Sequence, residues 1–107
     1  MATIKVLGQS YPSAATATTL YTAGTASGTV VSTINACNTS STADSIRIAV
    51  RPAGATLASQ HYVVYGATLP GNGQYAFTAG ITLANTDVVT IYSTNGTTAF
   101  NAYGQEQ

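Results

Sequence analysis

The sequence predicts an all-β protein that folds as one antiparallel β-sandwich of about eight strands, in a jelly-roll-like arrangement. Three observations lead to this prediction. Apolar residues never recur at helical spacing along the 107-residue chain. β-branched and aromatic residues form short runs, and Gly, Asn, Pro and Asp separate these runs at short intervals. The length suits a single domain over residues 1–107, and no linker or internal repeat divides it.

The runs place the expected strands in chain order. They cover residues 3–7, 18–22, 29–38, 45–51, 61–67, 74–83, 87–93 and 98–103. We expect segment 1–13, which contains the first strand, to be either an N-terminal arm or an edge strand. Pro52 ends the fourth strand, and residues 55–60, which show no clear period, leave room for one short helical turn.

Two of the later strands carry specific turn signals. Gly80 lies inside the run 74–83 and predicts a bend or bulge there. Asn95-Gly96 favours a type I′ turn, so we expect strands 87–93 and 98–103 to pair as a hairpin. The polar tail after Tyr103 is expected to fray unless a partner orders it.

Strict alternation along 45–51 predicts which residues face the core. Ile46, Ile48 and Val50 share one face, and Arg47 and Arg51 lie on the other. The same reasoning applied to all strands predicts the core Leu20, Val30, Ile34, Ile46, Ile48, Val50, Val64, Phe77, Ile81, Leu83, Val89, Ile91 and Phe100. Cys37 has no second cysteine to pair with, and we expect it to be a small buried core residue.

The composition makes nucleic acid and membranes poor partners. Charged residues are only 6% of the chain and the net charge is zero, against about 25% charged residues in an ordinary soluble domain. The N-terminal sequence has no secretory signal pattern, and no apolar run approaches the roughly 20 residues that cross a bilayer. We therefore expect a protein that is folded in a cytoplasm, with a charge-poor surface that favours association.

The sequence offers few groups for catalysis. Asp44, Asp87 and His61 could meet a hydroxyl in a triad-like arrangement, but no G-x-S-x-G motif is present. Each Asp precedes an expected strand, where a carboxylate commonly accepts backbone N–H groups. One His and one Cys cannot form a structural zinc site. We therefore expect no enzymatic activity, no metal and no cofactor.

Five residues are candidates for a binding interface: Arg47, Arg51, Tyr62, Tyr65 and Tyr103. The two arginines would lie about 13 Å apart on one strand face. They either contact a charged group of a partner, or are solvated or bridged to an Asp of the chain. Tyr62 and Tyr65 are expected on opposite faces, and Tyr103 lies near a strand end. Tyrosine suits interfaces because it combines a large apolar area with a polar tip.

Several segments resemble a known group of proteins. They are Leu20-Tyr21-Thr22, residues 31–39 (VSTINACNT), residues 45–50 (SIRIAV) and residues 100–104 (FNAYG). Together, from about Leu20 to Gly104, they resemble short virion structural proteins of tailed phages, notably phages that infect cyanobacteria. The resemblance carries over no catalytic residue and implies a component of the virion.

This resemblance, the size and the low charge lead us to expect a capsid cement or decoration protein on the outer surface of the phage head. Its partners would be the major capsid protein and copies of itself, as a trimer at local three-fold positions. The alternatives are a tail, baseplate or fibre module that contacts the host surface through glycans, and a free carbohydrate-binding module. In the leading interpretation the protein folds in the host cytoplasm and resides in the virion.

Overall fold

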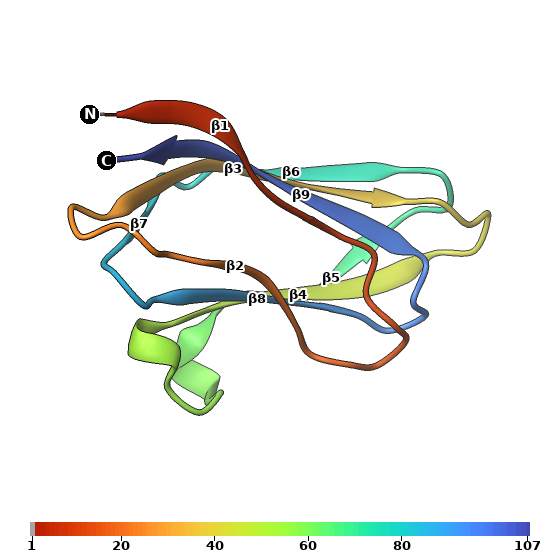
Figure 1. The fold of residues 1–107 in the computed structure, drawn as a ribbon. Helices are drawn as coiled ribbons and strands as arrows, with labels where there is room; N and C mark the ends of the chain where they lie inside the picture. The colour runs from red at the N-terminus through yellow and green to blue at the C-terminus, as the bar shows by residue number, and fades with distance from the viewer. Residues whose placement is uncertain (1) are drawn as a thin grey trace.

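The computed structural model describes residues 2–107 and consists of two antiparallel sheets packed face to face, which confirms the predicted β-sandwich (Figure 1). Its strands are β1 (Thr3–Ser10), β2 (Thr18–Thr22), β3 (Thr29–Asn38), β4 (Asp44–Arg51), β5 (Tyr62–Leu69), β6 (Gln74–Phe77), β7 (Ile81–Leu83), β8 (Val88–Ser93) and β9 (Thr98–Glu106). Two short 3₁₀ turns, η1 (Pro52–Gly54) and η2 (Ser59–His61), connect β4 to β5.

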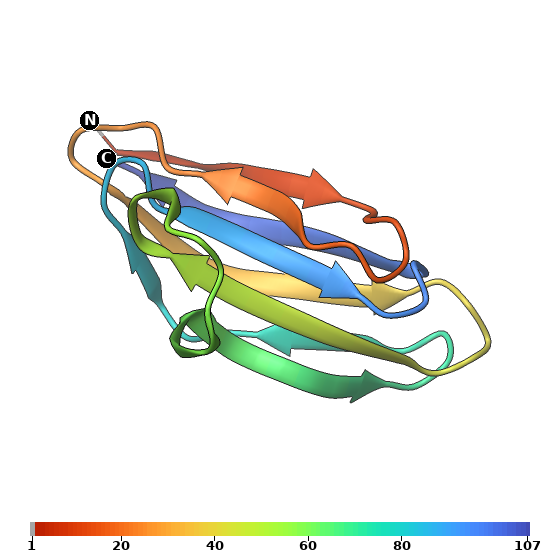
Figure 2. The same cartoon turned by 90° about the horizontal axis from the view of Figure 1, so that it is seen from below.

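The strand order is that of a jelly roll. Sheet A has the order β1-β9-β3-β6, with β7 also paired to β3, and sheet B has the order β2-β8-β4-β5. The chain thus forms one long antiparallel hairpin: β1 pairs with β9, β2 with β8, β3 with β6 and β7, and β4 with β5. Successive pairs alternate between the sheets, so the hairpin rolls around the core. Figure 2 shows sheet B in front of sheet A, with η1 and η2 over one end of it.

The N-terminal segment takes one of its two expected forms. Thr3–Ser10 is the edge strand of sheet A and pairs with β9 alone. Met1, the first residue of the expected segment 1–13, lies outside the described residues. The start of β1 lies beside the end of β9, where Thr3 pairs with Glu106 (Figure 1). Gly104–Glu106 belong to β9 and pair with both β1 and β3, so the expected fraying of this tail was wrong for these residues.

The core fills the space between the sheets. Its largest fully buried apolar side chains are Val31, Ile34, Ile46, Ile48, Leu69, Val89, Ile91 and Phe100. Among the predicted core residues, Val50, Phe77 and Ile81 are partly buried and pack against this cluster. Val30 is the exception, because it is 37% exposed while its neighbour Val31 is buried.

A β-bulge in β3 explains the error at Val30. The pairing of β3 with β9 shifts between Val31 and Thr33, so Ser32 is an extra residue in the ladder. The bulge reverses the alternation, and the inward residues change from Val31 on one side of it to Ile34 on the other. Strict alternation from Ile34 back to Val30 therefore selects the wrong valine.

The expected β-hairpin across Asn95-Gly96 is wrong. β8 belongs to sheet B and β9 to sheet A, so the two strands do not pair, and the connection crosses from one sheet to the other. Gly96 has a positive φ of 71°, but Asn95 does not, whereas a type I′ turn requires positive φ at both central residues. The dipeptide forms a turn here, but the pairing of β8 with β2 and β4 determines where the chain goes.

The other boundary predictions agree closely with the structure. Strands at 18–22 and 29–38 have the predicted bounds. The run 74–83 divides into β6 and β7 near Gly80, whose φ is 61°. This break agrees with the bend predicted at that glycine. The short helical turn expected within 55–60 overlaps the observed turn Ser59–His61, although His61 was expected to begin the next strand. A second turn at Pro52–Gly54 was not expected.

Candidate functional site

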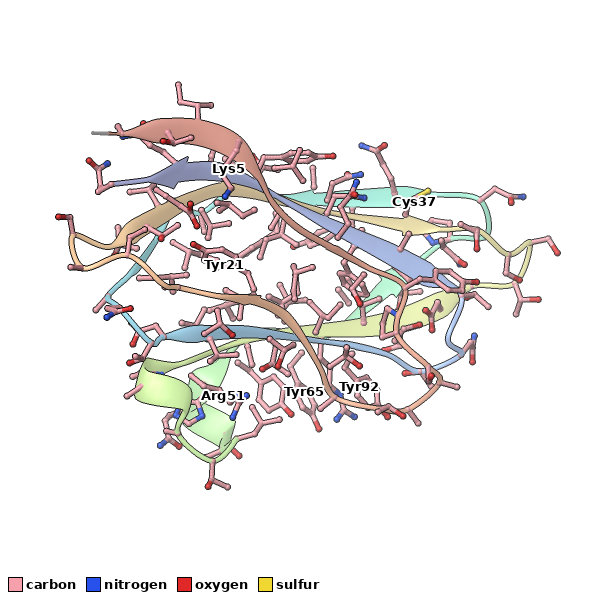
Figure 3. All side chains as sticks on the ribbon, viewed as in Figure 1. Lys5, Tyr21, Cys37, Arg51, Tyr65 and Tyr92 are labelled. Atoms are coloured by element: carbon pink, nitrogen blue, oxygen red, sulfur yellow. The ribbon has the colours of Figure 1, made fainter. Side chains whose placement is uncertain are left out.

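The outer face of sheet B carries a cluster of aromatic rings around one arginine. The guanidinium carbon of Arg47, on β4, lies 4.4 Å from the ring centroid of Tyr65 and 4.3 Å from that of Tyr92. Arg47 is paired with both tyrosines in the sheet, with Tyr65 on β5 and Tyr92 on β8. A guanidinium between two aromatic faces gains cation–π attraction and loses conformational freedom. Figure 3 shows Tyr65 and Tyr92 projecting from sheet B, away from the core.

Tyr62 joins this cluster, although alternation placed it on the face opposite Tyr65. The two rings meet edge to face with centroids 4.8 Å apart, so both lie outside sheet B. The reason is a bulge: Ile48 is paired with Val64 and Ala49 with Tyr62, which leaves Val63 as an extra residue. We call Arg47, Tyr62, Tyr65 and Tyr92 the tyrosine–arginine cluster.

A hollow adjoins the tyrosine–arginine cluster. It has a volume of about 630 Å³ and is lined by Tyr62, Tyr65 and the three residues Leu57, Ala58 and Ser59 of the η2 loop. Tyr65 is 66% exposed beside it. His61 shapes this loop, because its Nδ1 accepts a hydrogen bond of 3.0 Å from the backbone N–H of Ala58. Sheet B thus presents a concave aromatic surface next to a fixed cation.

Arg51 has a different role from Arg47. Its Nε donates to the Thr90 hydroxyl at 3.0 Å, and its Nη1 donates to the carbonyl oxygens of Gly54 at 3.3 Å and Ala55 at 2.9 Å. These bonds hold the η1 turn against sheet B. Arg51 therefore makes intramolecular contacts, but with carbonyl oxygens rather than with an Asp.

The outer face of sheet A carries an exposed apolar patch near the chain ends. Ile4, Val6, Val30 and Tyr103 form it, with exposed fractions of 84%, 49%, 37% and 39%. Ile4 and Val30 each pair with Gln105, while Val6 pairs with Tyr103, so the four side chains form neighbouring rows across β1, β9 and β3. A groove of about 480 Å³ runs between them. We call these four residues the apolar patch.

A polar cluster closes the end of the sandwich below the apolar patch. Lys5 donates to Glu106 Oε1 at 3.0 Å, and the Tyr21 hydroxyl donates to Glu106 Oε2 at 2.5 Å. Tyr21 also shares a 3.0 Å hydrogen bond with the hydroxyl of Thr29. Burial, and then the hydrogen bond to Glu106, raise the pKa of Tyr21. These contacts join β1, β2, β3 and β9, so they tie the edge strand to both sheets.

The carboxylates and His61 do not form a triad. Asp44 is 2% exposed and accepts hydrogen bonds from the hydroxyls of Ser93 and Thr98 and from the backbone N–H groups of Ser45 and Asn95. Asp87 accepts from the backbone N–H groups of Ala53 and Ala84. Both carboxylates thus satisfy backbone groups in turns, as predicted. Ser93 Oγ donates to Asp44 and in turn accepts from the N–H of Gly96, which makes it part of a structural network.

Cys37 lies on β3 and is half-buried. Because Ala36 and Asn38 on either side of it are buried, Cys37 faces outward, and the prediction of a core cysteine was wrong. Within residues 2–107, no three His, Cys, Asp or Glu side chains gather as metal ligands would. The same residues contain no helix long and apolar enough to span a membrane.

Comparisons with family models, with curated proteins and with solved structures found no match to this chain. The resemblance to phage virion proteins therefore remains a prediction.

Sequence reasoning missed Tyr92 and three members of the apolar patch. The signal for Tyr92 was present, because alternation with the predicted core residues Val89 and Ile91 leaves Tyr92 on the outer face. Ile4 and Val6 share one face of β1, while the opposite face carries Leu7 together with Lys5, so apolar residues on both faces left the buried face undecided. Leu7 is the residue that packs against the core.

We predict that the free energy of unfolding falls in acid. Hydrogen bonds from Tyr21 and then Lys5 hold the pKa of Glu106 below its ordinary value. Burial alone would raise the pKa of Asp44, but its hydrogen bonds from Ser93, Thr98 and two backbone N–H groups outweigh burial and lower it. As the pH falls, the unfolded chain therefore binds protons first. The stabilisation is complete above the unfolded pKa of about 4 and is lost as the pH drops through the folded values.

Urea unfolding followed by circular dichroism at a series of pH values tests this prediction. The midpoint should be constant near neutrality and should move to lower urea below roughly pH 4. A Glu106→Gln variant should have a shallower dependence because one of the two carboxylates no longer titrates. A urea midpoint that stays the same in acid would contradict the lowered pKa values of Glu106 and Asp44.

Proposed function

We propose that this protein is a structural component of a phage virion, a cement protein that binds the outer surface of the capsid shell and stabilises it. The apolar patch is the observation that supports this function best. A soluble monomer gains nothing from a row of exposed Ile and Val side chains, whereas a partner that covers them removes apolar area from water. Ile4, at 84% exposure, is the most exposed large apolar side chain of the described residues.

The position of the patch on an edge strand also supports assembly. β1 pairs with β9 on one side, and its other side has no partner strand within the described residues. Such an edge offers backbone N–H and C=O groups to a strand of a neighbouring subunit. A contact that combines the β1 edge with Ile4 and Val6 would therefore join hydrogen bonding to apolar burial.

The charge distribution is compatible with close packing in a lattice. The chain has three basic and three acidic residues. All three acids already accept hydrogen bonds within the molecule, Asp44 and Asp87 from turns and Glu106 from Tyr21 and Lys5. Little electrostatic repulsion therefore opposes the approach of neighbouring copies or of a shell surface.

A shell-stabilisation experiment tests the proposal. Purified protein is added to heads of the parent phage that were assembled without it, and the melting temperature of the shells is measured. The melting temperature should rise with protein concentration, since the protein binds the assembled shell and not its separated subunits. Val6→Ser should need about tenfold more protein for the same rise, because it removes buried apolar area from the contact.

Val63→Ser is the matched control. Val63 is 44% exposed, close to the 49% of Val6, but it lies on β5 in the other sheet. This variant should stabilise shells as well as the unmodified protein does. Equal effects of the two substitutions would contradict the role of the apolar patch. Intact virions are also labelled with gold-coupled antibodies to this protein. The cement function itself would be overturned if the unmodified protein fails to raise the melting temperature and the gold label is confined to the tail.

A further inference from the structure

We infer that the tyrosine–arginine cluster and the adjoining hollow form a binding site for a carboxylate-bearing sugar, such as a hexuronic acid unit of an acidic glycan. This site goes beyond the proposed capsid contact, because it lies on the outer face of sheet B, whereas the apolar patch lies on sheet A. The two surfaces can therefore be tested separately.

Arg47 is the group that would bind the carboxylate. Its guanidinium carbon lies 4.4 Å from the ring centroid of Tyr65 and 4.3 Å from that of Tyr92. Contact with aromatic rings does not use the N–H donors of the guanidinium, and the described residues supply its side chain with no hydrogen bond or ion pair. A fixed planar fork with free N–H donors matches the two oxygens of a carboxylate.

No acidic side chain of residues 2–107 forms an ion pair with Arg47. Asp44 is buried among Ser93 and Thr98, and the salt bridge found in residues 2–107 joins Glu106 to Lys5 in the other sheet. Asp87, the third acid, accepts from the N–H of Ala53 in the η1 turn, the turn whose carbonyl oxygens Arg51 binds. Arg47 therefore keeps a positive charge that no ion pair within the described residues neutralises, and this charge favours an anionic ligand.

The hollow supplies the surface for the sugar ring. Tyr65 lines the hollow and also lies 4.4 Å from the guanidinium carbon of Arg47, which is not itself part of the lining. The carboxylate of a sugar in the hollow would therefore reach Arg47 past the ring of Tyr65. Sugar C–H groups pack on the negative face of an aromatic ring, and the rings of Tyr62 and Tyr65 meet at 78°, which makes a corner rather than a flat wall. The hydroxyl of Ser59 adds a polar group at the rim.

The shape of the site favours a small sugar unit over a protein surface. A volume of about 630 Å³ falls within the usual range of small-molecule sites. A partner protein would more readily use the apolar patch, where the exposed side chains form rows across three strands. The aromatic corner with a single preoriented cation suits one ring that carries one carboxylate.

The test compares a galacturonic acid trisaccharide with its fully methyl-esterified form, which has the same rings and no charge. Amide chemical shifts of the full-length protein are followed by NMR during each titration. The acid should shift residues 57–65 and the neighbours of Arg47 and Tyr92, and should bind at least about tenfold more tightly than the ester. The difference should shrink as salt is added.

Substitutions assign the two parts of the site. Arg47→Gln should reduce the affinity for the acid to that for the ester, and Arg47→Lys should lose several-fold because the planar fork is gone. Tyr65→Leu should weaken both ligands. Lys5→Gln, which removes a cation from the other sheet, and Tyr103→Leu, which removes a 39% exposed tyrosine there, are the matched controls and should change neither affinity.

Three results would overturn the inference: equal binding of acid and ester, shifts centred on the apolar patch, and acetate or inorganic phosphate alone giving the same shifts at the same concentrations. The last would reveal an anion site with no contribution from the sugar. Failure here is distinguishable from failure of the proposed function. Shell stabilisation should survive Arg47→Gln, and acid binding should survive Val6→Ser.

Discussion

An Asp44→Ala variant should lose about 3 kcal/mol or more of unfolding free energy, measured by urea denaturation at neutral pH. The carboxylate is 2% exposed and accepts from the Thr98 hydroxyl at 2.6 Å, from the Ser93 hydroxyl, and from the backbone N–H groups of Ser45 at 2.8 Å and Asn95 at 2.9 Å. Removing it leaves these donors without an acceptor in a site that water does not reach easily. Unsatisfied buried donors cost about 1–3 kcal/mol each.

Asp44 also joins the two sheets, which adds to the expected cost. It begins β4 in sheet B, and its oxygen atoms bind Ser93 at the end of β8 and Thr98 at the start of β9 in sheet A. The crossing from β8 to β9 is thus held by this carboxylate where the expected hairpin is absent. The variant should therefore unfold cooperatively at lower urea rather than lose only one turn.

Asp87→Ala is the appropriate comparison for Asp44→Ala. Asp87 also accepts two backbone N–H bonds, from Ala53 at 2.8 Å and Ala84 at 2.9 Å, but it lies in an exposed turn where water can replace it. We expect a loss of only about 1 kcal/mol. Equal losses for the two variants would show that burial of the Asp44 network contributes little.

A Phe100→Ala variant should lose about 3–5 kcal/mol. Phe100 is 0% exposed and is the largest fully buried side chain in the core. It lies on β9, the strand of sheet A that pairs with both β1 and β3. Truncation would remove its transfer energy and leave a cavity that strands held in two ladders cannot close. This is a large part of the roughly 5–15 kcal/mol that stabilises a domain of this size.

Phe77→Ala separates burial from residue type. Phe77 is the other of the two phenylalanines and lies on β6 at the edge of sheet A. It is only partly buried beside Tyr75, with ring centroids 6.5 Å apart. Its truncation should cost about 1–2 kcal/mol, because water already reaches the ring and the edge strand can adjust. A cost as large as that of Phe100→Ala would contradict the assignment of the core centre.

The slope of the unfolding free energy against urea concentration distinguishes a loss of stability from partial loss of the fold in both variants. If the midpoint moves and the dependence on urea is unchanged, the substitution altered stability alone. We expect this behaviour for Asp44→Ala and Phe100→Ala, because neither residue adopts a backbone conformation that Ala would disfavour. A reduced slope would mean that part of the sandwich no longer folds with the rest.

The sequence alone was sufficient for the fold class and for most of the strands. Runs of β-branched and aromatic residues placed strands at 18–22 and 29–38 with their observed bounds, because extended-chain preference is a property of neighbouring residues. Alternation along 45–51 identified Ile46 and Ile48 as buried and Arg47 as outward. The turn roles of Asp44 and Asp87 were predicted in part, because each carboxylate accepts from a backbone N–H close in sequence, that of Ser45 or Ala84. Their other donors lie at least 34 residues away along the chain and could not be predicted locally.

The tertiary structure alone decided which strands pair and which residues cross to the other face. Asn95-Gly96 favours a hairpin locally, yet β8 pairs with β2 and β4, and the burial of two sheets outweighs one turn preference. Extra residues in the ladders of β3 and β5 reverse the alternation, so Val31 replaces Val30 in the core and Tyr62 joins Tyr65 outside. A bulge depends on the register with a distant strand, which residues close in sequence do not specify.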